Sequence, residues 1–188
     1  MIASPRDAGS GAGTTDGIDG IDGIDGIDGI DGIAVRLAPA GTSPYALLGA
    51  LGAGRVTRRP GAAPAAEHGH VSVSRTDGLV AVALSSRPVG IDVERVRPLP
   101  DLEQVVRDHL GAADAAAVRG ADDPVGAFYD VWTRLEALLK AEGVGILDGL
   151  DPAPAVRARW RVTPLDAGPD HRAALAHPAD RSAAGPGT

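Results

Sequence analysis

The segment Val89–Glu94 predicts a β-strand whose two faces differ in polarity. Successive side chains of a strand point to opposite faces, so Asp92 and Glu94 share one face while the apolar residues beside them enter a core. Two neighbouring carboxylates repel each other unless a cation lies between them, and a divalent metal with oxygen ligands is the usual cation. The same spacing also occurs on many solvent-exposed strands. The tripeptide Asp92–Glu94 alone therefore favours a solvated strand face over a metal site.

Two further strand-like segments precede this strand, at residues 71–74 and 79–84. The dipeptide Asp77-Gly78 between them is a hairpin signal, and Arg87-Pro88 marks the next connection. We therefore expect an antiparallel meander of three strands, with the acidic pair on its last strand.

The chain before the meander predicts a strand, a short helix and a loop. Residues 33–37 alternate in polarity, and Ser43-Pro44 supplies an N-cap and a first-turn proline for a helix that reaches Leu51. Residues 52–69 are rich in Gly, Pro and Ala, which is typical of a loop. The loop and the residue after it carry a cluster of basic and histidine side chains: Arg55, Arg58, Arg59, His68 and His70. Such clusters are usually solvated, although an anionic ligand can use them.

A long helix is predicted from Asp123-Pro124, which open it, to Gly143, which closes it. Glu136 and Lys140 are four residues apart and are expected side by side on its surface. Another face is apolar at helical spacing and predicts core packing rather than a docking surface. Its residues are Phe128, Trp132, Leu135 and Leu139.

Around the long helix the pattern is weaker. A shorter helix is expected over residues 101–110, and the Ala- and Asp-rich residues 111–122 are interpreted as a mobile segment. Two short strands are expected at 160–163 and 172–176, followed by a frayed tail.

Composition narrows the class of protein. The chain has 188 residues, 44% of them hydrophobic and 3% aromatic, which fits one domain with a core of Ala, Val and Leu. The absence of cysteine excludes a disulfide scaffold and a thiolate-held metal. Neither a secretion signal nor a membrane-spanning run is apparent, so we expect a soluble cytoplasmic protein.

The N-terminal segment is a low-complexity repeat. Residues 16–33 are six copies of Asp-Gly-Ile, without the proline of collagen or the nine-residue period of calcium-binding β-rolls. This composition favours disorder over residues 1–33. Of the net charge of −7, these residues contribute −6, so the acidity of the whole chain says nothing about a site.

Two motifs at a plausible separation resemble those of the surfactin-type (Sfp-type) 4′-phosphopantetheinyl transferases. That family carries a G-[IV]-D-[IV]-E strand, matched here by Gly90–Glu94, and a W-[ST]-x-K-E-A-x-x-K helix, matched by Trp132–Lys140. Its S-H-S-G segment corresponds to residues 73–78, and His68-Gly69 is similar to its H-G-[RK]-P segment. The resemblance covers residues 43–176.

Carried over residue by residue, the resemblance implies that Asp92, Glu94 and Glu136 bind Mg²⁺. It also implies that Lys140 contacts the phosphates of coenzyme A and that Arg75, in place of the family's histidine, contacts the 3′-phosphate. Glu136 is either the general base or only a metal ligand, because a bound metal makes a carboxylate a poorer base. Further candidates for binding the coenzyme are Thr76, Arg59 and His68.

The implied reaction is that of a holo-[acyl-carrier-protein] synthase type transferase. It moves the 4′-phosphopantetheine arm of coenzyme A to a serine of an acyl or peptidyl carrier protein and releases 3′,5′-ADP. Breaking the diphosphate needs a metal and a cation to neutralise the leaving group. The expected partners are therefore coenzyme A and a carrier protein, with no nucleic acid or membrane, and the expected state is a monomer.

Two departures from the family pattern leave alternatives open. Arg75 can bind a phosphate at least as well as a histidine, through its fork of donors. Leu135 stands where the family usually has a lysine, which removes a cation near the metal site. A degenerate relative that binds coenzyme A or a carrier without catalysis is one alternative, and an unrelated magnesium-dependent phosphohydrolase is another.

The fold class expected from the resemblance is α+β. Two pseudo-twofold halves, residues 34–97 and 98–177, would each pair a small antiparallel sheet with a packed helix, and coenzyme A would lie between them. Residues 1–33 would be a disordered segment and 178–188 a flexible tail. Carrier proteins are acidic and would dock on residues 95–122, where the candidate contacts are Arg95, Arg97 and Arg107.

Overall fold

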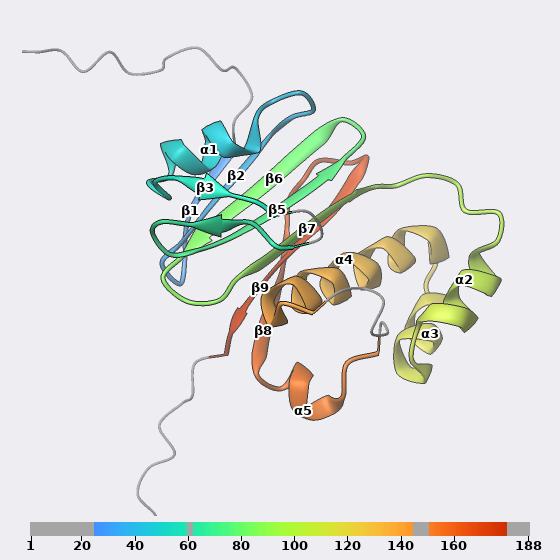
Figure 1. Ribbon diagram of the computed structural model, residues 1–188. Helices are drawn as coiled ribbons and strands as arrows, with labels where there is room; N and C mark the ends of the chain where they lie inside the picture. Colours follow the sequence, from blue (N-terminus) through green and yellow to red (C-terminus); the bar gives the residue numbers. More distant parts are fainter. Residues whose placement is uncertain (1–24, 60–61, 145–150, 180–188) are drawn as a thin grey trace, which may run out of the picture.

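A computed structural model describes residues 25–59, 62–144 and 151–179, and it contains three antiparallel sheets (Figure 1). The largest has the strand order β1-β2-β6-β5. Its strands are β1 (Asp25–Ile30), β2 (Ile33–Pro39), β5 (His70–Thr76) and β6 (Leu79–Ser85). The hairpin predicted at Asp77-Gly78 is confirmed, because β5 pairs with β6 and Gly78 has a φ of 89°.

A second sheet, of three strands, has the order β7-β9-β8. Its strands are β7 (Gly90–Arg95), β8 (Trp160–Leu165) and β9 (His171–Pro178). The prediction that β7 ends a meander with β5 and β6 is therefore wrong, because β7 pairs with β9 instead. The connection at Arg87-Pro88 carries the chain from one sheet to the other.

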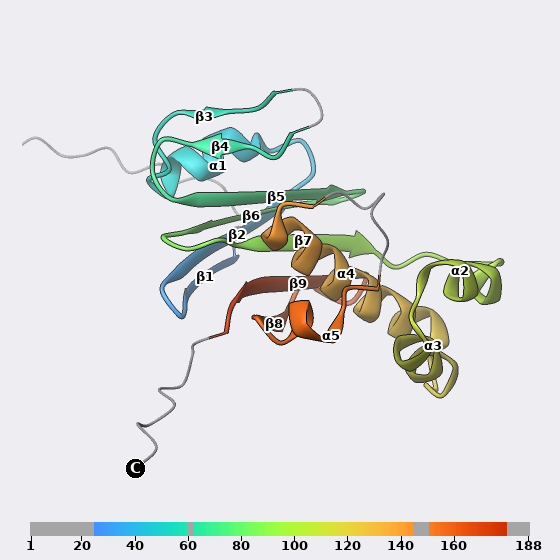
Figure 2. The ribbon, with the colours of Figure 1, turned by 60° about the horizontal axis from the view of Figure 1, so that its bottom comes forward.

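The two large sheets form the middle of a layered core (Figure 2). The inner face of the first sheet packs on β7 and β9 through apolar side chains that include Val35, Ala83, Ile91 and Leu175. The outer face of the first sheet is covered by α1 (Pro44–Ala50), which Ser43 caps as predicted. The second sheet is covered by α4 (Pro124–Glu142), which is the long helix predicted between Asp123 and Gly143.

Glycine at position 90 allows α4 to lie directly on β7. A Cβ added there would come within 1.9 Å of the Ala137 carbonyl oxygen and 2.6 Å of the Ala141 nitrogen. No side chain fits at these distances, so the first residue of the Gly90–Glu94 motif sets the approach of the helix to the strand. Asp92 and Glu94 are thereby brought close to the helix that carries Glu136.

Two small helices cover the end of α4. They are α2 (Leu102–His109), which was predicted, and α3 (Ala112–Arg119), which replaces the mobile segment expected over 111–122. The α3 residues Ala115 and Val118 are buried against Phe128 and Leu135 of α4, which explains why this Ala-rich stretch is ordered. Phe128 is buried and Trp132 partly so, and their predicted core role is confirmed.

Three short elements complete the described chain. Strands β3 (Val56–Thr57) and β4 (Ala65–Ala66) pair within the predicted loop, and α5 (Pro154–Arg157) precedes β8. No helix in the described part of the chain is long and apolar enough to cross a membrane.

The Asp-Gly-Ile repeat is not disordered throughout. Its copies over Asp25–Ile30 form β1, which pairs with β2 through a turn in which Asp31 and Gly32 have φ values of 49° and 75°. Positive φ at both central residues is typical of a two-residue hairpin, for which Asp-Gly is a preferred sequence. The prediction of disorder is therefore wrong for residues 25–33, while residues 1–24 lie outside the described part.

The α+β class with small antiparallel sheets and packed helices is confirmed. The pseudo-twofold relation and the division at residues 97 and 98 stay predictions. The described part of the chain ends at residue 179, and β9 continues to Pro178, the first residue of the predicted tail.

Candidate functional site

The inner face of β5 carries hydroxyl side chains where its neighbours carry apolar ones. Ser74 Oγ donates to Asp92 Oδ1 at 2.8 Å and Thr76 Oγ1 donates to Glu94 Oε2 at 3.2 Å, both across 18 residues of sequence. A constant offset means that β5 and β7 run in the same direction, side by side. Ser72 Oγ also accepts from the Ile91 backbone nitrogen at 3.0 Å. These hydroxyls therefore form hydrogen bonds along the edge of β7 that does not pair with β9.

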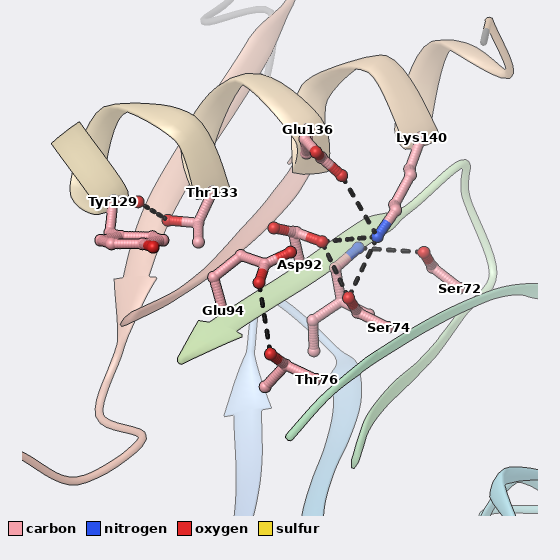
Figure 3. Close-up of polar contacts among 10 residues, drawn as sticks. Ser72, Ser74, Thr76, Asp92, Glu94, Tyr129, Thr133, Glu136 and Lys140 are labelled. Carbon is pink, nitrogen blue, oxygen red and sulfur yellow. Dashed lines mark hydrogen bonds and ion pairs between the residues drawn. The ribbon is translucent and has the colours of Figure 1, made fainter. Parts of the chain in front are cut away.

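Asp92 is the most buried acid of the site, with 1% of its surface exposed. Its Oδ1 accepts from Ser74 and from Lys140 Nζ, which is 2.6 Å away (Figure 3). Its Oδ2 has no hydrogen-bond partner among the described residues. One oxygen is therefore neutralised, and the other is a buried acceptor without a donor.

Glu136 and Lys140 lie one turn apart on α4, and both line the same cavity. Their ion pair is long, at 4.0 Å, so they are side by side as predicted. Their expected position on the surface is wrong, because Glu136 is only 7% exposed and the Lys140 side chain 30%. Burial and the charge of Asp92 raise the pKa of Glu136 to about 7.

Glu94 lies at the outer end of the group. Burial, followed by the charge of Asp92, raises the pKa of Glu94 above its usual value, while the hydrogen bond from Thr76 and the charge of Lys140 oppose the shift. The three carboxylates are thus close enough to disfavour one another's charge, which is the situation that a cation relieves.

A cavity of about 620 Å³ lies between β5, β7 and α4. It is lined by all four residues of the two matched motifs that were predicted to act, namely Asp92, Glu94, Glu136 and Lys140. Arg75 also lines it and extends into a neighbouring cavity of about 440 Å³, to which Thr76 contributes. The volume is within the range of ligand-binding pockets.

Two of the predicted coenzyme contacts lie elsewhere. Arg59 and His68 are exposed and are not among the described residues that line either cavity, whereas Arg58 lines the larger one. The basic bias of the loop was a usable signal, but sequence alone does not say which arginine turns inward.

Sequence reasoning also missed Tyr45, which is 41% exposed and lines both cavities. Its position in the first turn of α1 gives no sign of this in the sequence. It could be found only once the helix was placed over the first sheet.

Leu135 does not leave the site short of a cation. Its side chain is buried against Val106, Val118 and Leu139, in the cluster formed with α2 and α3. Because this face of α4 points away from the cavity, the departure from the family's lysine changes core packing rather than the charge beside Asp92.

The donors fit the magnesium ion that the resemblance implies. Carboxylate oxygens are the ligands that Mg²⁺ prefers, and Asp92 Oδ2 is a buried oxygen to which no described residue donates. Among the described residues, however, no three acidic, histidine or cysteine side chains are arranged as a metal site. The cation that lies among the acids in this structure is the ammonium group of Lys140, within 4.0 Å of both Asp92 and Glu136.

The fold and the site define an α+β domain with an acidic pocket, a lysine within it and arginines at its wall, which suits a phosphate-bearing ligand and a divalent cation. A family model described as the 4′-phosphopantetheinyl transferase superfamily matches residues 88–180. The matched residues, about half of the chain, belong to this superfamily.

Two curated relatives agree with the family model. The chain is 32% identical over 84 residues to 4′-phosphopantetheinyl transferase Sfp of Bacillus subtilis (strain 168), a match that covers 44% of this chain and 37% of that protein. It is 30% identical over 77 residues to 4′-phosphopantetheinyl transferase gsp of Aneurinibacillus migulanus, covering 41% of this chain and 32% of the relative. The chain therefore spans about a third of the length of these relatives.

Proposed function

We propose that this chain transfers the 4′-phosphopantetheine arm of coenzyme A to a serine of an acyl or peptidyl carrier protein, in a Mg²⁺-dependent reaction that releases 3′,5′-ADP. The observation that carries the proposal is the gathering of Asp92, Glu94, Glu136 and Lys140 around one cavity. The names of the two relatives support the same activity and favour the surfactin type within the superfamily.

The residues have separate tasks in this reaction. Asp92, Glu94 and Glu136 hold Mg²⁺, which when bound neutralises charge on the diphosphate. Lys140, which lines the cavity, binds a phosphate, and Arg75 and the nearby Arg58 add positive charge at the cavity wall. The serine oxygen attacks the β-phosphorus, and the bond to the bridging oxygen of 3′,5′-ADP breaks.

The proton of the serine goes to Glu136 or, through a water, to solvent. Glu136 is the family's candidate for the base, and its burial beside Asp92 makes it a good proton acceptor as long as the metal does not engage it fully. If Glu136 is only a metal ligand, its removal weakens metal binding and activity together. If it is the base, a neutral variant loses activity while the metal still binds.

A carrier protein would dock on residues 95–122, which follow Glu94 of the site directly in the chain. Arg95 and Arg97 lie there and share an ion pair with Asp77, at 2.6 Å and 3.5 Å. Exposed pairs of this kind are weak, so an acidic carrier can replace Asp77 at little cost. We also propose that the protein acts as a monomer in the cytoplasm and binds neither nucleic acid nor membrane.

The test is mass spectrometry of a generic apo carrier protein incubated with the full chain. The carrier should gain the mass of one phosphopantetheine arm only when both Mg²⁺ and coenzyme A are present, and 3′,5′-ADP should appear in equal amount. Glu136→Gln should abolish the gain. Asp130→Asn is the matched control, because Asp130 is a partly exposed acid of the same helix that pairs with Arg172 outside the cavity.

The carrier assay, together with calorimetry of coenzyme A binding and a phosphate-release assay, separates the competing functions. A non-catalytic relative would bind coenzyme A in a calorimeter and give no product, and a phosphohydrolase would release phosphate from nucleotides without any carrier. The burial of Leu135 removes the main reason to expect a degenerate site.

A further inference from the structure

The hydroxyl of Ser74 joins the two charged elements of the site. It donates its single proton to Asp92 Oδ1 at 2.8 Å, and its oxygen accepts from Lys140 Nζ at 3.1 Å. The serine is buried, with 6% of its surface exposed, so water does not readily replace either bond. Figure 3 shows the three side chains meeting between the β7 strand and α4.

The result is an asymmetric carboxylate. Asp92 Oδ1 accepts from both Ser74 and Lys140, whereas Oδ2 has no hydrogen-bond partner among the described residues. A carboxylate held by one oxygen cannot rotate freely about its Cβ–Cγ bond. The second oxygen is then kept in a fixed direction without competing donors, which is what a metal ligand requires.

Thr76 repeats the arrangement two residues further along β5. Its hydroxyl donates to Glu94 Oε2 at 3.2 Å and accepts from the Arg95 backbone nitrogen at 3.1 Å. The parallel course of β5 and β7 places each hydroxyl opposite one acid of the motif. This bond is longer and less buried than that of Ser74, so its contribution should be smaller.

A direct role for Ser74 in binding phosphate is harder to reconcile with these bonds. A hydroxyl has one proton, and that of Ser74 is already directed to a buried carboxylate. Turning it to a phosphate would leave Asp92 with one donor fewer in a buried position, which is costly.

We propose that Ser74, with Thr76 in a lesser part, is a positioning residue that fixes the acids of β7 for a divalent cation. The inference rests on the metal-binding role of Asp92 and Glu94 in the proposed function. It assigns the two hydroxyls a task that concerns the carboxylates and not the substrate.

The test is calorimetric titration of the full chain with Mg²⁺ and with Mn²⁺. The thermal midpoint of unfolding is measured for each variant as well. Ser74→Ala should weaken metal affinity about tenfold, as is typical when a partner of a metal ligand is removed. Ser74→Thr, which keeps the hydroxyl, should restore most of the affinity, and Thr76→Val should show a smaller loss.

Ser85→Ala is the matched control. Ser85, like Ser74, is a buried serine with a hydrogen-bonded hydroxyl, which accepts from the backbone nitrogen of Arg87. Unlike Ser74, it lies outside the cavity. Its loss should lower the thermal midpoint without changing metal affinity. If Ser74→Ala does not fold, Ser74→Cys keeps the volume with a much weaker donor and should give the same loss.

Unchanged metal affinity in Ser74→Ala, or an equal loss in Ser85→Ala, would overturn the positioning role, and so would a wild-type chain that binds no divalent cation. The carrier assay reports on the proposed function separately. A chain that binds the metal and responds to Ser74→Ala, yet never modifies a carrier, would refute the transferase and leave the positioning role standing.

Discussion

At the scale of single residues, the site depends on one lysine that neutralises a buried acid. Asp92 is 1% exposed and Lys140 Nζ lies 2.6 Å from its Oδ1. Lys140→Met should lower the free energy of unfolding of the metal-free protein by about 2–3 kcal/mol, because a buried carboxylate loses its counter-ion. Urea denaturation measures this loss, and Asp92→Asn in the same chain should recover most of it. If the losses in the free energy of unfolding from Lys140→Met and Asp92→Asn simply add in the double variant, the two side chains do not form the pair.

Glu136 gives the metal-free protein a pH dependence of known sign. Its native pKa of about 7 exceeds the value of 4.5 expected when unfolded, so the native state binds the proton more tightly. The contribution of Glu136 to the free energy of unfolding should therefore be largest below pH 4.5. It should fall as the pH rises to about 7 and then level off.

Denaturation in the presence of a chelator, between pH 5 and pH 8, measures this effect of Glu136. The raised pKa of Glu94 adds to the decline with the same sign. Glu136→Gln should have a flatter profile than the wild type and should be relatively more stable at pH 8. Parallel profiles for the two proteins would show that Glu136 keeps an ordinary pKa.

At the scale of elements, the packing of α4 on β7 depends on the absence of one side chain. Gly90→Ala would place a Cβ within 1.9 Å of the Ala137 carbonyl oxygen, and neither backbone can move without opening the core. We expect a loss of about 2–3 kcal/mol in the free energy of unfolding. Gly49→Ala is the control, because Gly49 lies in α1 and, among the described residues, an added Cβ meets nothing within 4 Å beyond its chain neighbours and its own helix backbone.

The control variant should be neutral or stabilising by up to about 1 kcal/mol, since alanine is the better helix former. Thermal and urea unfolding of both variants give the comparison. If Gly90→Ala is as stable as Gly49→Ala, the close contact between strand and helix does not exist in solution.

Local signals predicted most of these elements correctly. Ser43-Pro44, Asp77-Gly78, Asp123-Pro124 and Gly143 mark boundaries through backbone chemistry that acts over a few residues, and the structure has turns or helix ends at each. The partner of β7 was predicted wrongly for the opposite reason. Its hydrogen bonds go to β9, about 80 residues away, and no turn signal specifies a pairing over that distance.

The residues of the site were likewise predicted where a local motif specifies them and missed where only the tertiary structure does. Asp92, Glu94, Glu136 and Lys140 were found because two motifs fix their types and spacing. Ser74 lies in the segment 73–78 that matches the family, but its role was not predicted, because that role depends on the parallel course of β5 beside β7, which follows only from the tertiary arrangement.

At the scale of the whole molecule, the cavity joins parts that otherwise belong to separate layers. Its walls come from β5 in the first sheet, β7 in the second and α4 on the outer face of the second. A ligand that bridges these walls binds only when both sheets and the helix are in place. Its binding free energy therefore stabilises all three together, by about 2.7 kcal/mol at a hundredfold excess over the dissociation constant.

Hydrogen exchange with and without coenzyme A and Mg²⁺ tests this coupling. Slower exchange is expected in peptides from β5, β7 and α4, and little change in α2 and α3, whose described residues do not line the cavity. Asp92→Asn should show much weaker protection at the same ligand concentrations, because the buried carboxylate that we propose as a metal ligand is gone. Protection confined to β5, with α4 unaffected, would mean that the ligand binds the first sheet alone and that the carboxylates of the second sheet and its helix do not form one site with it.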